Sequence, residues 1–315
     1  MLSSISSMKE NIEFTANGKL LLTGEYLVLA GAKALAFPVR FGQSMTILPC
    51  RKKSIRWTSF ENGIPWFSCE LDPWKLEIIT SSDLKTASGL TDILLSAGRI
   101  NPGFLSGTDG LKVAVKANYP VKWGLGSSST LIALVAQWAG IDPFQLFTSV
   151  SDGSGYDIAC ATRKDPFFYR IRDRVPLVCD VFPGKAIRRN ACFAYLGRKQ
   201  ETPPEVSSFL SSKNYEENEI IRVSELSEAI CNSDDPSLFC SFIDEHEEIL
   251  SRILDKERIQ KRFAAFPGIV KSLGAWGGDF AMFAGRMKND KIKNWLMKAG
   301  LEVVFTYDEL QVIPF

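Results

Sequence analysis

Residues 120–129 read Pro120-Val121-Lys122-Trp123-Gly124-Leu125-Gly126-Ser127-Ser128-Ser129, and an apolar run from Thr130 to Ala136 follows them. Glycine carries no Cβ and tolerates unusual backbone angles, so this stretch can bring bare N–H groups close to an anion. The apolar run predicts a helix, whose first N–H groups and positive dipole end favour phosphate. The hydroxyls can cap this helix, or ligate a magnesium ion that a nucleotide carries. Taken alone, the stretch is equally consistent with an ordinary glycine turn followed by serine N-caps.

Three other segments contain glycine and charged or hydroxyl residues in a similar way. They are Asn17-Gly18-Lys19-Leu20-Leu21-Leu22-Thr23-Gly24-Glu25-Tyr26, Gly153-Ser154-Gly155-Tyr156-Asp157-Ile158-Ala159 and Gly274-Ala275-Trp276-Gly277-Gly278-Asp279. At these residues the chain resembles the GHMP kinases, the superfamily of galactokinase, homoserine kinase, mevalonate kinase and phosphomevalonate kinase. The motifs occur in the family's order. Within the superfamily the likeness is greatest to phosphomevalonate kinase, because mevalonate kinase usually has a histidine at the position of Tyr26.

The resemblance implies an α+β protein with the two-domain GHMP-kinase fold. We expect an α/β nucleotide-binding N-terminal domain at residues 9–180 and a ferredoxin-like C-terminal domain at residues 181–315. The chain's composition shifts between Arg170 and Arg189, where prolines and a glycine stand among charged residues, and this agrees with a boundary there. A length of 315 residues is sufficient for one large or two medium domains.

Hydrophobic patterns predict elements that fit this organisation. In the N-terminal part we expect strands at Leu20–Leu22, Tyr26–Leu29, Ala34–Val39, Ser44–Leu48, Ile55–Thr58 and Leu111–Ala117, and a helix at Ser88–Gly98. In the C-terminal part we expect strands at Ala191–Leu196, Phe280–Phe283 and Val303–Thr306, helices between Ser207 and Phe263, and a basic helix at Lys288–Lys298.

Phosphoryl transfer needs a cradle for the donor phosphates, a metal, nearby positive charge and a group that orients or deprotonates the acceptor. The resemblance assigns ATP binding to Gly124, Leu125, Gly126, Ser127, Ser128 and Ser129, with Ser128 as the Mg²⁺ ligand. It implies that Asp157 is the catalytic carboxylate and that Lys19 lies beside the transferred phosphoryl group. The plainer alternatives are a helix cap for Asp157 and a surface lysine for Lys19.

The C-terminal part contributes further candidates. Gly274, Gly277 and Gly278 resemble the family's third, glycine-rich motif. Arg198 and Lys199 stand where phosphomevalonate kinases have a substrate-binding loop, although a solvated basic turn explains them equally well. Glu25 has two open roles, a structural one and contact with the metal.

The chain departs from the family pattern at three places. Trp276 replaces a glycine of the third motif, which would narrow that turn and puts its contact with phosphate in doubt. Ser128 and Asp157 are closer in sequence than in typical members. Leu146 occupies the position of the metal-binding glutamate of mevalonate kinase, so either Asp152 substitutes for it, or Ser128, Asp157 and water suffice.

Composition narrows the other classes of function. The net charge of +1 gives no global reason to expect nucleic acid or membrane partners. The seven cysteines show no C-x-x-C spacing and predict buried thiols, not a disulfide or zinc framework. The single histidine, His246, lies in an acidic run and is expected to be a solvated helix residue, so a multi-histidine metal site is excluded.

The sequence therefore predicts an enzyme, an ATP- and Mg²⁺-dependent kinase that acts on a small molecule of the mevalonate pathway. The first residues lack the apolar run of a signal peptide, so we expect a cytoplasmic protein, monomeric or homodimeric. Mevalonate kinase, or a homoserine or sugar kinase, is the alternative within the superfamily. The alternative from another class is a non-catalytic nucleotide- or metabolite-binding regulator with the same fold. The joint presence of Lys19 and Asp157 favours catalysis, because a binding protein needs no such pair.

Overall fold

The computed structural model describes residues 12–108, 110–197, 209, 214–274, 276 and 279–312. Contacts within the chain divide it into two compact units that interleave along the sequence. Unit 1 comprises residues 1–18, 41–121 and 125–162, and unit 2 comprises residues 19–40, 122–124 and 163–315. Strands β1 (Ile12–Thr23) and β2 (Ala34–Pro49) contribute residues to both units. The continuous domains 9–180 and 181–315 stay a prediction.

Unit 1 is built on a mixed β-sheet. The second half of β2 pairs antiparallel with β6 (Leu111–Ala117), and β6 pairs in parallel with β3 (Ile55–Glu61). Strands β4 (Ile64–Leu71) and β5 (Ile78–Ser81) continue the sheet by antiparallel pairing. The strand expected at 111–117 is confirmed with its bounds. Its alternating residues Leu111, Val113 and Val115 are all buried, as the alternation of apolar and polar residues predicts for a strand with one face in the core.

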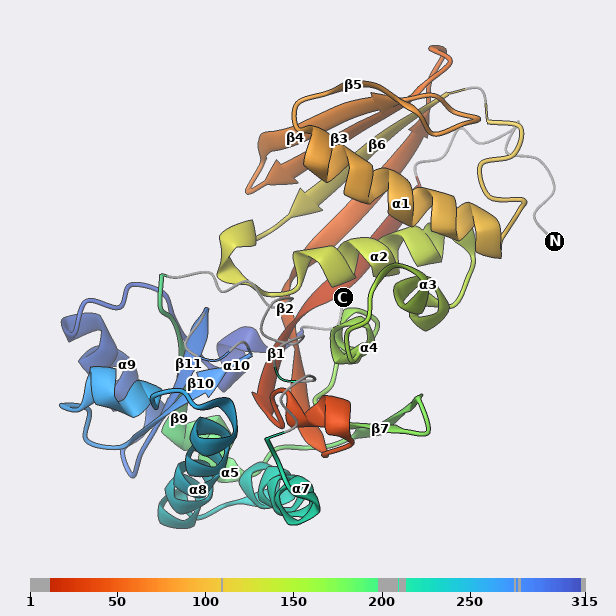
Figure 1. Cartoon of the computed structure of the whole chain (residues 1–315). Helices are drawn as coiled ribbons and strands as arrows, with labels where there is room; N and C mark the ends of the chain where they lie inside the picture. Colours follow the sequence, from red (N-terminus) through yellow and green to blue (C-terminus); the bar gives the residue numbers. More distant parts are fainter. Residues whose placement is uncertain are drawn as a thin grey trace. The chain divides into compact units, whose positions relative to one another are not determined.

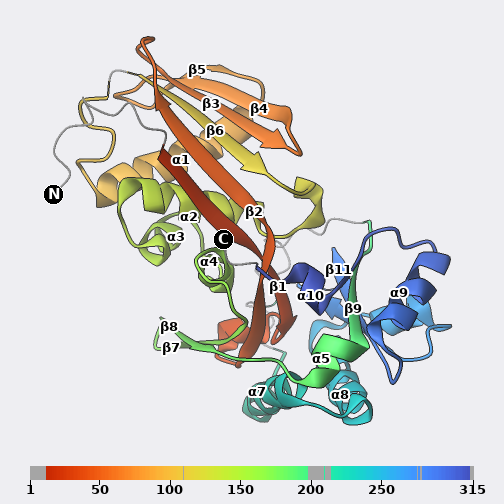
Figure 2. The same cartoon turned by 180° about the vertical axis from the view of Figure 1, so that it is seen from behind.

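Four helices of unit 1 build its core against this sheet. They are α1 (Leu84–Ile100), α2 (Ser127–Ala139), α3 (Pro143–Val150) and α4 (Tyr156–Ala161). Helices α1 and α2 lie along one face of the sheet (Figures 1 and 2). Leu94 of α1 and Ala133 of α2 join the buried cluster that includes Trp57 of β3. The Asp83 carboxylate caps α1 by accepting from the Thr86 N–H at 2.7 Å, which explains why this helix begins before the predicted Ser88.

Unit 2 contains a four-stranded antiparallel sheet with the order β10-β11-β9-β12. Its strands are β9 (Ala191–Tyr195), β10 (Ile269–Leu273), β11 (Phe280–Ala284) and β12 (Val304–Thr306). Helices α7 (Glu217–Asn232) and α8 (Pro236–Leu254) connect β9 to β10, and α9 (Asn289–Lys298) connects β11 to β12. This β-α-β-β-α-β arrangement is the ferredoxin-like one, so the expected fold class is confirmed.

The remaining elements of unit 2 frame that sheet. Strands β7 (Phe167–Arg172) and β8 (Val175–Asp180) form a hairpin, and β7 pairs with the first residues of β2. The described residues of unit 2 also form two short helices, α5 (Lys185–Asn190) and α10 (Tyr307–Leu310), and two 3-10 helices, Leu27–Ala30 and Ile259–Phe263. A further 3-10 turn spans Val121–Trp123.

One sequence prediction about this region is wrong. The segment Tyr26–Leu29 was expected to be a strand, but Leu27–Ala30 form a 3-10 helix. The reason is local backbone geometry, since both Gly24 and Tyr26 have positive φ angles, which end an extended chain. The apolar residues Leu27 and Val28 are buried all the same.

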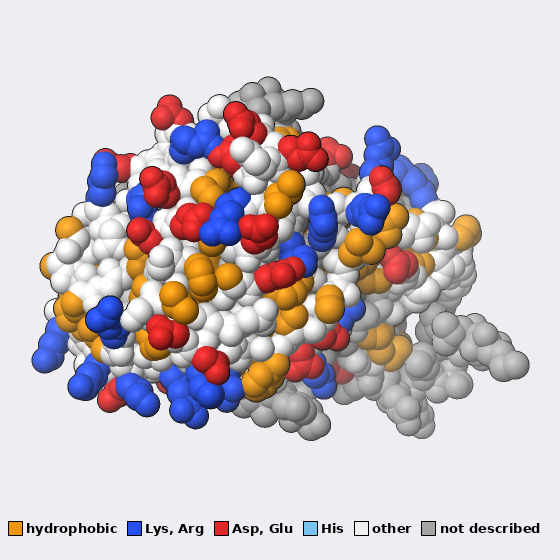
Figure 3. Space-filling view, turned by 90° about the horizontal axis from the view of Figure 1, so that it is seen from below, with side chains coloured by type: hydrophobic (Ala, Val, Ile, Leu, Met, Phe, Trp, Pro, Cys, Tyr) orange, Lys and Arg blue, Asp and Glu red, His pale blue; other side chains and the backbone are white. Residues whose placement is uncertain are grey.

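Charges of both signs are interspersed on the face of the molecule shown in Figure 3, as the net charge of +1 leads one to expect. Among the described helices, none combines the length and apolar character that crossing a membrane requires.

Candidate active site

The predicted phosphate loop is divided between the two units. Residues 122–124 belong to unit 2 and Leu125 onward to unit 1. In unit 1, helix α2 begins at Ser127 and has Gly126 as its N-cap, with φ of 89° and no side-chain capping bond. This left-handed conformation favours glycine, and a glycine N-cap leaves the first-turn N–H groups without a side-chain acceptor. Ser128 is exposed and Ser129 is buried.

Asp157 lies in the first turn of α4, whose N-cap is Gly155 at φ 78°. Its carboxylate does not cap the helix from the N-cap position. Instead, Oδ2 accepts a hydrogen bond from the Ser129 hydroxyl at 2.5 Å, and Oδ1 accepts from the Ile158 N–H at 3.1 Å. Two residues predicted for the site, 28 positions apart, are thus in direct contact within unit 1. The serine that meets the carboxylate is Ser129, which no spacing rule distinguishes from its neighbours.

The surroundings of these residues limit how a magnesium ion can be held. Leu146, at the position where mevalonate kinase has a metal-binding glutamate, is fully buried in the apolar core of unit 1, and a carboxylate would be costly to bury there. Asp152 is exposed. No group of three or more His, Cys, Asp or Glu side chains in the described part of the chain is placed to hold a metal. Ser128 and Asp152 are both exposed, so their accessibility does not distinguish between the two metal arrangements expected from the sequence, and the roles of Ser128, Asp152 and Asp157 toward Mg²⁺ stay predictions.

In unit 2, the structure places Lys19 of β1 beside the third motif. A Cβ added to Gly274 would lie 4.0 Å from the Lys19 Nζ, so the ammonium group is close to this turn. Gly274 has φ of 69°, which explains why glycine follows β10. The structure therefore brings the first and third motifs together although they are more than 250 positions apart in the sequence.

Asp279 is a candidate site residue to which the sequence motif Gly274–Asp279 assigns no role. A Cβ on Gly124 would lie only 1.7 Å from the Asp279 Oδ2, so no other residue fits at Gly124 without displacing this carboxylate. Burial raises the pKa of the nearby Tyr195, and the negative charge of Asp279 raises it further. The signal that could have identified Asp279 is its place directly after Gly277 and Gly278.

The residue before Gly124 anchors this part of the loop. The Trp123 ring lies 6.0 Å from the Tyr195 ring and 5.7 Å from the Phe305 ring, and the Tyr195 hydroxyl donates to the Lys122 carbonyl at 3.2 Å. Aromatic contacts of this kind stabilise the packing beyond the area they bury. They hold Lys122–Gly124 against the four-stranded sheet of unit 2.

Trp276 of the third motif lies among the described residues. Its side chain is buried, and its indole N–H donates to the Glu257 carbonyl at 3.1 Å. It belongs to a hydrophobic cluster with Tyr26 and Leu250. Trp276, at the position where the resemblance leads one to expect glycine, therefore contributes to the core of unit 2.

Four predicted site residues lie outside the described residues. They are Arg198, Lys199, Gly277 and Gly278, whose roles stay predictions.

His246 is not the solvated residue that the acidic run suggested. It is fully buried on α8, and its Nε2 accepts a hydrogen bond from the Gly24 N–H at 3.1 Å. Its neighbour Glu247 is also fully buried and contacts Lys271, which in turn contacts Glu25 at 2.7 Å. The acidic residues around His246 misled the sequence reasoning because only one face of an amphipathic helix is solvated.

This geometry favours the structural role for Glu25, since its carboxylate is paired with the buried Lys271 ammonium. Burial is the main reason that the pKa of Glu25 is raised to about 7; Lys271 lowers it and Glu247 raises it. Burial likewise raises the pKa of Glu247. Although burial lowers the pKa of Lys271, the two carboxylates raise it above its ordinary value.

These shifts predict a pH dependence of stability. The folded protein holds the Glu25 proton more tightly than the unfolded chain does, so this proton stabilises the fold. Its contribution to the free energy of unfolding is complete below the ordinary glutamate pKa of 4.5 and is lost as the pH rises through about 7. We expect Glu25→Gln to reduce the fall in the free energy of unfolding between pH 5 and 8 by on the order of 2 kcal/mol. Urea unfolding at both pH values measures it. Glu248→Gln, at an exposed position of α8, is the control and should show the same decrease in the free energy of unfolding as the wild type. If Glu25→Gln also shows the wild-type decrease, Glu25 is not the source of this pH dependence.

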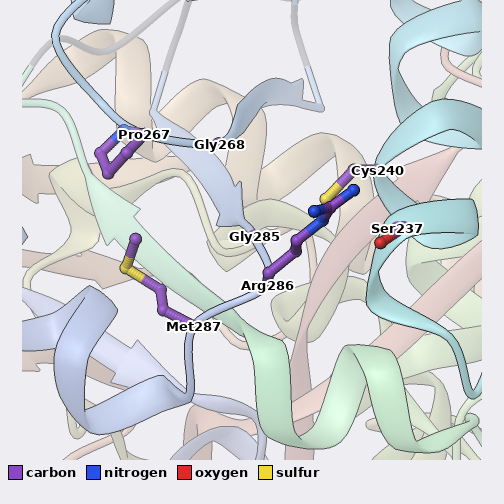
Figure 4. A pocket seen from close by; sticks show the side chains of 7 residues that line it. All are labelled: Ser237, Cys240, Pro267, Gly268, Gly285, Arg286 and Met287. Carbon is purple, nitrogen blue, oxygen red and sulfur yellow. The ribbon is translucent and has the colours of Figure 1, made fainter.

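Two surface pockets in unit 2 contain none of the predicted site residues. One, of about 280 Å³, is lined by Ser237, Cys240, Pro267, Gly268, Gly285, Arg286 and Met287. Figure 4 shows the Arg286 side chain extending toward Cys240 and Ser237 of α8. Burial raises the pKa of the Cys240 thiol to about 11, so it is no nucleophile at neutral pH. The other, of about 310 Å³, includes Asp165, Phe182 and Tyr307.

No protein-family model matches the chain, and no curated protein matches it. Solved structures do. Phosphomevalonate kinase from Streptococcus pneumoniae, in complex with phosphomevalonate and AMPPNP, is 16% identical over 93% of this chain and 98% of its own, with a TM-score of 0.70. Mevalonate kinase from L. major, in complex with R-mevalonate, is 14% identical over 97% and 98%, with a TM-score of 0.68. Galactokinase from Lactococcus lactis, complexed with galactose, is 10% identical over 98% and 94%, with a TM-score of 0.65.

These similarities extend over nearly the whole of each chain and include three kinds of GHMP kinase. Together with the ferredoxin-like sheet of unit 2, they confirm that the chain has the fold of the GHMP kinases.

Proposed function

We propose that this protein is an ATP-dependent kinase of the GHMP type that phosphorylates a small molecule, and that its acceptor is phosphomevalonate. The observation that carries the proposal is the hydrogen bond of 2.5 Å from the Ser129 hydroxyl to the Asp157 carboxylate. It places a carboxylate at the first turn of α2, the helix whose N-terminus follows the glycine loop.

A carboxylate at this position is informative because of its charge. The N-terminus of a helix attracts anions such as phosphate. A protein that only binds phosphate there gains nothing from a carboxylate beside it, because the two negative groups repel each other. A kinase needs both, since a carboxylate is required to orient or deprotonate the acceptor and to balance a metal ion. This argument favours catalysis over the non-catalytic regulator.

The residues of unit 1 fit the cofactors that the proposal requires. The N–H groups of Gly126 to Ser129 would hold the donor phosphates, and the exposed Ser128 hydroxyl would contact Mg²⁺. When bound, ATP supplies the phosphoryl group and Mg²⁺ neutralises charge on its phosphates. Asp157 orients the acceptor oxygen, and takes its proton where that oxygen is a hydroxyl. Lys19, beside Gly274 in unit 2, supplies positive charge for the transferred phosphoryl group.

The choice of phosphomevalonate is supported by the sequence at Tyr26 and by the structural similarity to the phosphomevalonate kinase of Streptococcus pneumoniae. Its carboxylate and phosphate need cations in addition to those that serve ATP. Arg198 and Lys199 are our candidates for this purpose.

Coupled ADP release against a panel of phosphomevalonate, mevalonate, homoserine and galactose tests the proposal. We expect the highest kcat/KM with phosphomevalonate. If mevalonate is the better substrate, the protein is a mevalonate kinase instead. If ATP binds in calorimetry but no acceptor on a wide panel releases ADP, catalysis is the wrong proposal and the regulator takes its place.

A further inference from the structure

The turn after β1 has an unusual backbone at Tyr26. Its φ of 59° and ψ of −49° lie outside the regions that residues with a side chain normally adopt. The Leu27 N–H donates to the Glu25 carbonyl at 2.6 Å, which closes a three-residue γ-turn with Tyr26 at its centre. γ-turns with positive φ are rare and strained, and such strain persists only where the surroundings enforce it.

Buried polar contacts hold Gly24 and Glu25, the two residues that precede Tyr26. Before it, the Gly24 N–H donates to His246 Nε2 at 3.1 Å, and the Glu25 Oε1 accepts from Lys271 at 2.7 Å. Lys271 also donates to Glu247 at 3.0 Å. At Tyr26 itself, the ring packs 5.7 Å from the ring of Phe209. The four polar side chains are all buried, with at most 1% of their surface exposed.

The protonation states suit this arrangement. Burial lowers the pKa of His246 well below its ordinary range, and the Lys271 ammonium lowers it further, so the ring stays neutral and Nε2 can accept the Gly24 N–H. The Glu247 Oε2 accepts from the Ser272 N–H at 3.3 Å, and Lys271 donates to the Ser272 carbonyl at 3.2 Å. The contacts therefore join the turn, α8 and the end of β10.

Stability alone does not explain these groups. Burying charges costs free energy that their attraction regains only in part, and well-packed apolar side chains often serve equally well. The elements that they join suggest a different purpose. The turn directly follows β1, which carries Lys19, and Lys271 stands three residues before Gly274. Lys19 and Gly274 are themselves neighbours in unit 2.

We propose that His246, Glu247 and Lys271 form a buried clamp that holds the strained turn at Tyr26 and thereby sets the position of Lys19 relative to Gly274. They are positioning residues, and their catalytic meaning rests on the proposed kinase function. The clamp extends the site to α8, an element to which none of the sequence motifs belongs.

The test compares two substitutions of His246. In His246→Leu the Gly24 N–H loses its acceptor, whereas the side-chain oxygen of His246→Gln can take the place of Nε2. We expect His246→Leu to lower kcat by about 10- to 100-fold with little change in KM for ATP, because misplacing a group by about 1 Å can lower the rate by about 100-fold. His246→Gln should recover most of the loss. Glu248→Leu, which puts the same side chain at an exposed position of α8, is the control.

A merely structural role for His246 predicts a lower Tm but an unchanged kcat of the folded protein well below Tm, and that result overturns the proposal. If His246→Leu does not fold, Glu247→Gln replaces it in the test. This substitution keeps the shape of the side chain but removes one charge from the clamp, and its kcat is measured in the same way. A wild-type kcat in folded Glu247→Gln also overturns it.

Amide hydrogen exchange separates this proposal from the kinase function. In His246→Leu we expect exchange of residues 19–26 to be at least about tenfold faster than in the wild type, with exchange of β3 and β6 in unit 1 unchanged. This readout needs no substrate, so it tests the clamp even if the wild type phosphorylates none of the acceptors. Equal exchange rates of residues 19–26 in both proteins would disprove the clamp.

Discussion

Asp157→Asn is expected to lower kcat by about 10²- to 10⁴-fold, the usual contribution of one acid–base group. Asparagine retains the shape of the side chain and can still accept the Ser129 hydroxyl bond, but it carries no charge and is a poor base. The loss should be largest for a hydroxyl acceptor, which must give up its proton. The phosphate of phosphomevalonate, the proposed acceptor, is largely ionised at neutral pH, so with this substrate only the orienting role is lost and the decrease should lie toward the lower end of the range, about 10²-fold. Coupled ADP release at saturating substrates measures the change.

Asp173→Asn is the matched control for this substitution. Asp173 is an exposed carboxylate in the β7–β8 turn, with φ of 52°, a conformation that asparagine tolerates. It should leave kcat unchanged, and circular dichroism should show both variants folded. A folded Asp157→Asn enzyme with near wild-type kcat means that Asp157 is a structural residue and that the acceptor is activated elsewhere.

The second large effect is expected for Gly126→Val. A β-branched residue is strained at the φ of 89° found at Gly126, and its side chain would project from the N-terminus of α2, where phosphate is proposed to bind. Relaxing the strain by turning the loop would misdirect the N–H groups. A cost of about 1–3 kcal/mol in binding corresponds to an ATP affinity roughly 5- to 150-fold weaker, which calorimetry measures.

Gly63→Val separates the strain from the binding. Gly63 lies in the β3–β4 turn of the same unit, has φ of 83°, and an added Cβ there would meet no atom within 4 Å. Both valine variants should lose similar stability, but only Gly126→Val should lose affinity for ATP. If a folded Gly126→Val protein binds ATP as tightly as the wild type, the nucleotide binds elsewhere.

The elements that carry the candidate site were largely predictable from the sequence because their signals are local. The glycines before Ser127 and before Tyr156 indicated tight turns that lead into helices, and α2 and α4 begin at these residues. Alternating apolar residues predicted β6, and helical spacing predicted α8. The order of the motifs implied the GHMP-kinase fold, which the structural comparisons confirm. Patterns of this kind extend over a few residues, within the range in which backbone preferences act.

What only the tertiary structure decided concerns partners that are distant in the sequence. The resemblance singled out Ser128 among the three serines, but the hydroxyl that donates to Asp157 is that of Ser129. An acidic run made His246 look solvated, but its ring accepts a hydrogen bond from Gly24, 222 positions away. The apolar segment at Tyr26 looked like a strand, yet a strained turn held by buried charges ends β1 there. Sequence alone determined which residues prefer turns, helices and strands. The packing of unit 2 decided which charged side chains are buried together, because contact energies depend on neighbours that local preferences do not specify.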